Sequence, residues 1–472
     1  MPTAVEPRAE TMTPADPPEN TGGFARTLLV AVGLSVVLFA ISSAFGTGSY
    51  DVIGGFFVGP ALFAITIPML ARQAKREGDS RLLTLFVIAL GLKLLGAIAR
   101  YVLAIDLYQG KNDALFYDHV GKLGMENFRG GDFTLPDGAG TSGTDFMGLL
   151  TGVVYTVIGP TIIGGFLFFS WLGFLGLFMF YRAFLLAVPE GRKQTYSRLI
   201  FFLPSLLFWP SSIGKESWMM FTLGVAAYGA AKLLSGKTTA GLMIAAVGLW
   251  WAALPRPHIA AVTALSILAA FIVRKPKKEL GILGPMLKIF SLGLVIVASV
   301  FFVSQATSFL QSSGVDTSQG LTGALEEAAD RSSGGKSTFQ APVLTSPGAA
   351  PMAIVTVLFR PTIVDAHNAQ ALLAAVEGTF LAVLTLVRFR WGAAAIRLIR
   401  RRPYVFTSLL MVGMLIVAFS SIGNLGILAR ERVQLLPFFL VLLAVPSKKW
   451  IAKREARELR KTRRPLFAQT GA

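Results

Sequence analysis

Long apolar runs alternate with short charged segments between residues 24 and 445. A run of about 20 apolar residues is long enough to cross the hydrocarbon core of a bilayer as a helix. The pattern therefore predicts an all-α, polytopic membrane protein with about 12 transmembrane helices. The predicted spans are residues 24–45, 52–70, 82–105, 161–186, 199–209, 218–233, 240–254, 259–273, 282–303, 369–387, 405–422 and 433–445.

Lysine and arginine residues gather after alternate spans, for example at 72–81 and 388–402. Because basic segments are retained on the cytoplasmic side, their positions predict a cell inner-membrane protein whose two termini are cytoplasmic. The proline- and polar-rich segment 1–23 is expected to be disordered. The basic tail, 446–472, is expected to contact anionic lipid headgroups, which leaves 24–445 as the transmembrane domain.

Two long segments, 106–160 and 304–368, are predicted to lie at the outer face. Up to Phe146 the first segment contains seven acidic residues and three basic ones. Its last part, 147–160, is apolar but too short to span, so it is expected to form an interfacial helix. The second segment is rich in serine and glycine and is expected to be mobile, and its end, 351–368, is expected to form a second interfacial element.

The composition supports this class of protein. Of the 472 residues, 53% are hydrophobic and 15% are charged, whereas a soluble protein carries about 25% charged residues. The net charge of +18 would suit nucleic acid in a soluble chain, but here the cations lie between apolar runs, and we expect no nucleic-acid partner. The chain has no cysteine and three histidines, so a thiolate site is excluded and a histidine-rich metal centre is not expected. Nothing in the residues supports a divalent metal.

A mixed set of acidic and basic side chains falls in segments predicted to lie at the outer face. A carboxylate can take a proton from a hydroxyl nucleophile, and arginine or lysine can hold a lipid phosphate and stabilise charge on it as it leaves. The candidate catalytic residues are Asp113 and Asp118. The candidate substrate- and phosphate-binding residues are Lys215, Arg256, His258, Arg360, His367, Arg430 and Arg432. Five positions on a helix separate two residues by about 140°, so Asp113 and Asp118 would not share a face, and Asp113 is favoured as a single base.

The stretch NDALFYDHVGKLGMENFRGGDF, residues 112–133, resembles the first outer loop of GT-C membrane glycosyltransferases. Two later stretches, FFLPSLLFWPSSIGKESWMMFTLGVAAYG and RERVQLLPFFLVLLA, are similar to segments of bacterial proteins of this type. The resemblance, which extends to protein O-mannosyltransferases and aminoarabinose transferases, implies a polyprenyl-phosphate-linked sugar as donor, no further cofactor, and a glycan, lipid or protein acceptor. It also implies that Asp113 is the general base. Ala114 follows it, so the acidic pair of some family members is absent.

Two other classes of function stay open from the residues. An O-antigen-type polysaccharide polymerase or ligase would use a pyrophosphate-linked oligosaccharide and the late outer loop, where Arg360 and His367 lie. A transporter or lipid flippase would use ionisable residues at mid-membrane, and Lys93 and Glu377 are predicted there. Buried ions are costly and usually partnered, so a structural Lys93–Glu377 pair is the simpler expectation. No internal repeat of the kind found in transporters is visible.

Overall fold

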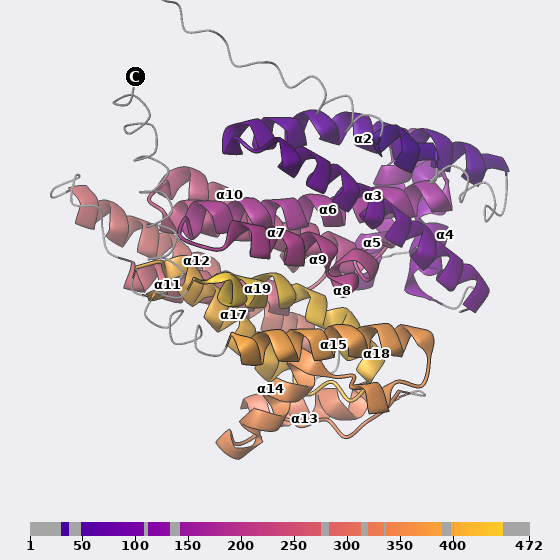
Figure 1. The fold of residues 1–472 in the computed structure, drawn as a ribbon. Helices are drawn as coiled ribbons and strands as arrows, with labels where there is room; N and C mark the ends of the chain where they lie inside the picture. The colour runs from indigo at the N-terminus through magenta and orange to yellow at the C-terminus, as the bar shows by residue number, and fades with distance from the viewer. Residues whose placement is uncertain are drawn as a thin grey trace, which may run out of the picture.

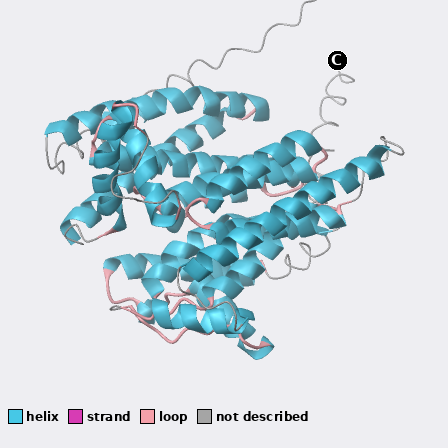
Figure 2. Ribbon diagram, turned by 180° about the vertical axis from the view of Figure 1, so that it is seen from behind, coloured by secondary structure: helices cyan, strands magenta, loops and turns pink. Residues whose placement is uncertain are grey.

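The computed structural model describes residues 30–36, 49–107, 112–132, 142–274, 283–312, 320–334, 337–388, 398–399 and 401–446. Within these ranges the regular elements are all helices, and the only extended pairing there is one isolated bridge between Thr338 and Asn424 (Figure 2). The all-α prediction is therefore confirmed. The terminal segments 1–23 and 447–472, for which disorder and lipid contact are predicted, lie outside the described residues.

The helices follow one another in a simple order along the chain. The α-helices that frame the bundle are α2 (Ser49–Glu77), α3 (Ser80–Val102), α4 (Asp113–Arg129), α5 (Gly143–Ile158), α6 (Ile162–Ala187), α7 (Lys193–Phe202), α8 (Pro204–Phe208), α9 (Lys215–Leu234), α10 (Thr238–Ala253), α11 (Pro257–Val273), α12 (Leu283–Ser312), α13 (Gly320–Ser332), α14 (Ala350–Phe359), α15 (Ala369–Val387), α17 (Pro403–Phe419), α18 (Leu425–Glu431) and α19 (Leu436–Ala444). Short helical turns join them, namely the π-helix η1 (Leu103–Leu107) and the 3-10 helices η4 (Pro347–Ala349), η5 (Ile363–Asp365) and η6 (Arg432–Gln434).

Helices α6 and α9 form the middle of the bundle (Figure 1). Helices α2 and α3 lie on one side of them, and α17, α19, α14 and α15 lie on the other. The α6–α9 contact is close because glycines face each other. A Cβ atom built at Gly176 would lie 2.2 Å from the Met220 carbonyl oxygen, and one at Gly224 would lie 2.4 Å from the Gly176 carbonyl oxygen. Small residues at such crossings let two helix backbones approach, which is the common way helices associate in membranes.

Four described helices are long and apolar enough to cross a membrane, judged by length and composition: Ile53–Glu77, Ser80–Ile105, Ile162–Ala187 and Ala369–Val387. Further apolar helices of 10–17 residues accompany them, including Thr238–Ala253 and Pro403–Phe419. Large apolar side chains of α2, such as Phe57 and Ile65, each 65% exposed, cover its outer surface. These features are consistent with a membrane protein. The four helices do not establish the predicted number of spans, which stays a prediction.

Several predicted boundaries are wrong, for local reasons. The predicted span 199–209 is broken into α7 and α8 because Pro204 begins a new helix and cannot donate to the α7 ladder. The segment 106–146, expected to be a loop, contains α4, and the serine- and glycine-rich part of 304–368 contains α13. Helix α12 continues to Ser312, nine residues past the predicted end at 303. The predicted span 433–445 is divided into η6 and α19, with Pro437 in the first turn of α19.

Candidate functional site

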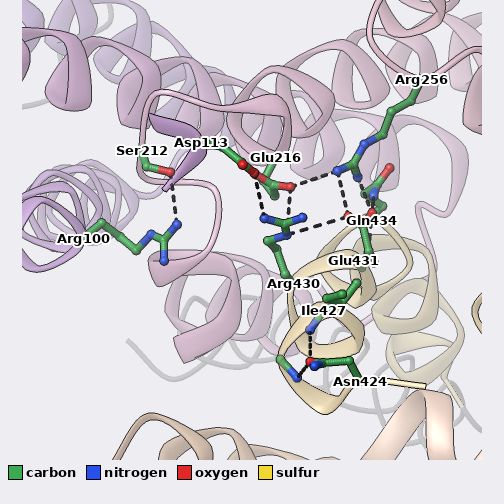
Figure 3. Close-up of polar contacts among 11 residues, drawn as sticks. Arg100, Asp113, Ser212, Glu216, Arg256, Asn424, Ile427, Arg430, Glu431 and Gln434 are labelled. Carbon is green, nitrogen blue, oxygen red and sulfur yellow. Dashed lines mark hydrogen bonds and ion pairs between the residues drawn. The ribbon is translucent and has the colours of Figure 1, made fainter. Parts of the chain in front are cut away.

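Five charged side chains from four helices meet at the end of the bundle that carries α4 and α18 (Figure 3). We call them the ionic cluster: Asp113, Glu216, Arg256, Arg430 and Glu431. Asp113 is the first residue of α4, and Glu216 lies in the first turn of α9. Arg256 precedes α11, and Arg430 and Glu431 close α18. The cluster therefore gathers helix ends that are far apart in the sequence.

Arg256 forms the buried centre of the ionic cluster. Its Nη2 donates to Glu216 Oε1 at 2.9 Å and to Glu431 Oε1 at 2.7 Å, and its Nη1 donates to Glu431 Oε2. The three side chains are only 9%, 7% and 13% exposed, respectively. Gln434 Nε2 donates a further bond of 2.7 Å to Glu431 Oε2. A guanidinium held between two buried carboxylates is occupied by them, so Arg256 serves to hold α9, α11 and α18 together.

Arg430 connects the buried part of the cluster to the exposed carboxylate of Asp113. Its Nη1 lies 3.3 Å from Asp113 Oδ2, and its Nε lies 3.4 Å from Glu216 Oε1. The Asp113 side chain is 67% exposed and the Arg430 side chain 31% exposed. Asp113 is thus the cluster's carboxylate that an incoming molecule can reach, and Arg430 is the guanidinium beside it.

The charges of the cluster shift the titration of its members. Burial alone raises the pKa of the Glu216 carboxyl, but the Arg430 and Arg256 guanidinium charges outweigh it and bring the pKa below its usual value. The nearby Glu216 carboxylate in turn raises the pKa of Arg430 above its usual value, against the effect of burial. Glu216 and Arg430 are therefore both ionised at neutral pH, and Glu216 has no proton to supply.

Local structure before α4 places Asp113 in the cluster. Asn112 Oδ1 accepts from Leu115 N at 3.2 Å and caps α4, while Asn112 Nδ2 donates to the Ala104 carbonyl oxygen at 3.0 Å. Ala104 belongs to the π-helix η1, and π-helical turns frequently occur at functional sites. Asn112 therefore ties the start of α4 to the end of α3, and this contact sets the position of Asp113.

Two further predicted residues lie beside the cluster. Lys215 Nζ bonds to Thr144 Oγ1 at 3.0 Å, and burial, followed by the charge of Arg256, lowers the pKa of Lys215. Burial also lowers the pKa of His258 to about 3, with smaller contributions from the charges of Arg256 and Lys215. Of the predicted site residues, the structure thus brings together Asp113, Lys215, Arg256, His258 and Arg430.

The other four predicted residues are engaged elsewhere or exposed. Asp118 is buried and accepts from Tyr155 Oη at 2.5 Å and from Lys122 Nζ at 2.8 Å, so it does not share a face with Asp113, as the spacing predicts. Arg360 forms an ion pair of 2.6 Å with Asp365.

Arg432 is fully buried and donates to the Leu358 and Arg360 carbonyl oxygens at 3.1 and 2.7 Å. His367 is exposed. Asp118 and Arg432 are therefore engaged in contacts between different helices, and Arg360 is engaged in a local contact with η5.

The sequence also predicts Glu216, Glu431 and Gln434 at the outer face and Arg100 near it, but these residues were not selected as site residues. In the structure Glu216 and Glu431 bind Arg256, and Gln434 donates to Glu431. The Arg100 guanidinium lies 5.1 and 5.2 Å from the ring centroids of Phe208 and Trp209 and bonds to Ser212 Oγ at 3.4 Å. In Figure 3 this guanidinium points toward Arg430. The available signals were the Lys215-Glu216 dipeptide, the Arg-Glu-Arg sequence at 430–432, and a cation in the last turn of α3.

We expect the stability of the protein to fall between pH 7 and pH 5 because of His258. In the unfolded chain this histidine takes up a proton near pH 6.5, whereas in the folded chain it stays neutral until about pH 3. The unfolded state then binds more protons, so stability falls as the pH falls below 6.5, by about 2 kcal/mol at pH 5. Unfolding of the detergent-solubilised protein at both pH values, compared with His258→Gln, measures this. An unchanged pH dependence in the variant would contradict the assignment, and His119→Gln, at an exposed position, is the control.

No protein-family model, no curated protein and no solved structure matches this chain at a significant level. Within the described residues, no group of three or more histidine or acidic side chains is arranged to hold a metal ion.

Proposed function

We propose that the protein is an inner-membrane glycosyltransferase with about 12 spans and cytoplasmic termini. It transfers a sugar from a polyprenyl-phosphate carrier to a glycan, lipid or protein of the cell envelope at the outer face. The observation that carries the proposal is the ionic cluster. It joins an exposed carboxylate to converging cations at one end of an apolar helix bundle.

Asp113 is the general base of the proposed reaction. Its exposed carboxylate takes the proton of the acceptor hydroxyl, and the acceptor oxygen then forms a bond to the anomeric carbon of the sugar. The bond between that carbon and the phosphate oxygen breaks, and the phosphate leaves with the bonding electron pair. Arg430, whose Nη1 lies 3.3 Å from Asp113 Oδ2, keeps the carboxylate oriented.

The cations around Asp113 suit the leaving phosphate. Arg256 is held by Glu216 and Glu431, and the proposed contacts to the carrier come from Arg430, Lys215 and Arg100. Four cations surround three carboxylates here, so the site favours an additional anion. Guanidinium groups bind phosphate oxygens through two parallel hydrogen bonds, and these bonds strengthen as charge develops on the leaving group.

The other two classes of function depend on residues outside the cluster. A polymerase or ligase would use Arg360 and His367, but Arg360 is paired with Asp365 and also lies over the Phe339 ring at 4.7 Å. A transporter would use Lys93 and Glu377, and both of these bind the backbone of α8. The geometry therefore favours the transferase.

Lys215→Met is expected to lower kcat/KM for the lipid-linked donor by about 10- to 100-fold, because one charge-assisted contact to the phosphate is lost. Stability should change little, since Nζ bonds only to the Thr144 hydroxyl among the groups described for it. The measurement is transfer of labelled sugar from a polyprenyl-phosphate donor in proteoliposomes. Lys237→Met is the matched control, because Lys237 is an exposed lysine in the turn that follows the opposite end of α9. Equal rates for both variants and the unchanged protein would remove Lys215 from the site.

A further inference from the structure

Two buried charged side chains bind the ends of the short helix α8. Lys93 Nζ donates to the Leu206 carbonyl oxygen at 2.6 Å and to that of Leu207 at 3.5 Å, near the C-terminal end of α8. Glu377 Oε2 accepts from the backbone N–H of Ser205 at 2.6 Å, in the first turn of α8. Lys93 is 0% exposed and Glu377 is 3% exposed, although they belong to different helices, α3 and α15.

The predicted Lys93–Glu377 pair is therefore wrong. Within the described chain no ion pair of 4 Å or less joins the two side chains, and each is engaged with α8 instead. The physical reason is that α8 is a short helix that begins after the break at Leu203 and is followed by Pro210, which has no N–H to bind the Leu206 carbonyl oxygen. A broken helix leaves carbonyl oxygens and N–H groups without partners in the bundle interior. A cation suits the carbonyl end and a carboxylate suits the N–H end, since each also opposes the helix dipole there.

A continuous series of contacts leads from Lys93 and α8 to the ionic cluster. Ser211 Oγ donates to the Leu207 carbonyl oxygen at 2.6 Å and lies in contact with Ser170 Oγ, 3.1 Å away. Ser170 Oγ in turn donates to the Lys93 carbonyl oxygen at 2.8 Å. The next residue, Ser212, accepts from Arg100 through its hydroxyl and from Ser217 through its carbonyl oxygen, at 3.4 and 2.8 Å.

Residues 209–216 thus connect α8 to the first turn of α9. This segment contains Trp209, on which Arg100 lies, and it ends at Glu216, which binds Arg256 and Arg430. Ser211 and Ser212 of this segment are 0% and 3% exposed and are bonded to α8 and to α9, respectively. A movement of α8 would therefore displace the contacts at the start of α9.

The charge of Glu377 also acts on Arg432, the residue after Glu431. Burial lowers the pKa of Arg432, and the charge of Glu377 counteracts this lowering. Arg432 directly follows Glu431 and binds the Leu358 and Arg360 carbonyl oxygens. The charge of Glu377 therefore stabilises the charged form of Arg432, which follows the ionic cluster in the chain.

We propose that Lys93 and Glu377 are positioning residues that clamp α8 and thereby hold segment 209–216, with its contacts to Arg100 and the ionic cluster, in place. This inference deepens the proposed function, because a role of Lys93 and Glu377 in catalysis depends on that function. The effect of Lys93 and Glu377 on the position of segment 209–216 can be tested without a transfer assay.

The absence of cysteine from the sequence allows a test with a single introduced thiol. Ser212→Cys places a thiol at a position that is 3% exposed, and its rate of reaction with a maleimide reports opening of segment 209–216. We expect Lys93→Met in this background to raise the rate about tenfold or more, because the carbonyl end of α8 loses its partner. Lys93→Arg restores a donor and should return the rate toward that of the parent.

A second thiol separates local from general loosening. Ser408→Cys lies in α17 and is 0% exposed, and its labelling rate should not change with Lys93→Met. Equal rates at Ser212→Cys with and without Lys93→Met would overturn the proposal. So would equal acceleration at both thiols, since that outcome shows a purely structural role. Glu377→Leu provides the same comparison for the other end of α8.

The two proposals fail in different ways. If Lys93→Met does not accelerate labelling of Ser212→Cys, the proposed role of Lys93 at α8 is wrong and the transferase proposal is unaffected. Accelerated labelling in a protein that shows no sugar transfer would retain the clamp and remove the proposed activity. For an active protein, Lys93→Met should lower kcat more than it raises KM, because the reacting groups are misaligned while the donor still binds.

Discussion

Asp113→Asn is expected to lower the rate of sugar transfer by about 10²- to 10⁴-fold. Asparagine keeps the size and the hydrogen-bonding oxygen of aspartate but cannot accept the proton of the acceptor hydroxyl. The side chain is 67% exposed and its only ion pair among the described residues is with Arg430. An exposed pair contributes about 1 kcal/mol or less, so the variant should fold normally. A large loss of rate without a loss of stability identifies a chemical role.

The assay is transfer of labelled sugar in membranes that contain either protein at equal amounts. Glu126→Gln is a matched control, because Glu126 is an exposed acid on the same helix α4 and outside the cluster. Asp118→Asn is expected to behave differently, since it disturbs the buried contacts with Tyr155 and Lys122 and should reduce stability. Full transfer activity in Asp113→Asn would remove Asp113 as the base.

Arg256→Gln is expected to destabilise the protein by about 3–5 kcal/mol, the usual cost of removing one partner from a buried ion pair. The substitution leaves the carboxylates of Glu216 and Glu431 buried beside each other, with side chains 7% and 13% exposed. Arg430 does not replace the two hydrogen bonds that Arg256 donates to Glu431, since its Nε lies 3.9 Å from Glu431 Oε1, an ion-pair distance that is too long for a hydrogen bond. Unfolding in detergent, followed by circular dichroism, measures the loss.

Arg402→Gln is the matched control for this result. Arg402 pairs with Glu190 at 2.5 Å, but these side chains are 35% and 34% exposed, and the loss should stay below about 1 kcal/mol. The double variant Arg256→Gln/Glu431→Gln should recover part of the stability, because one uncompensated carboxylate is removed. If Arg256→Gln costs no more than Arg402→Gln, the cluster is not the structural centre of this end of the bundle.

The helices were predictable where residue type alone decides the conformation. The predicted span 369–387 has the same bounds as α15, and 161–186 differs from α6 by one residue at each end. Both are predominantly apolar runs without proline, with Thr161 or Asn368 in the capping position, where each side chain accepts from the helix backbone. The predictions were poorer at α4, which is amphipathic and lies in an acidic segment that resembles a loop, and at α7 and α8, where a proline interrupts an apolar run.

The candidate site was predictable only in part, because its residues were selected by type. Charged residues and histidines in segments predicted to lie at the outer face were selected as site residues. Five of the nine selected residues meet in or beside the ionic cluster. Arg360 and Arg432 have the same chemical character but are occupied by Asp365 and by backbone carbonyl oxygens. No local pattern separates a guanidinium that is available to a ligand from one that is satisfied by the protein.

The sequence by itself determined an all-helical chain rich in membrane-compatible segments, because helix formation and hydropathy depend on neighbouring residues and on their side-chain types. Only the tertiary structure decided which charges meet. Arg256 binds a carboxylate 175 positions away, Arg430 binds one 317 positions away, and Glu377 caps a helix 172 positions earlier in the chain. Such contacts depend on how helices cross and where one of them breaks. The same charges that the sequence presents as separate polar sites therefore become one cluster and one clamp in the folded protein.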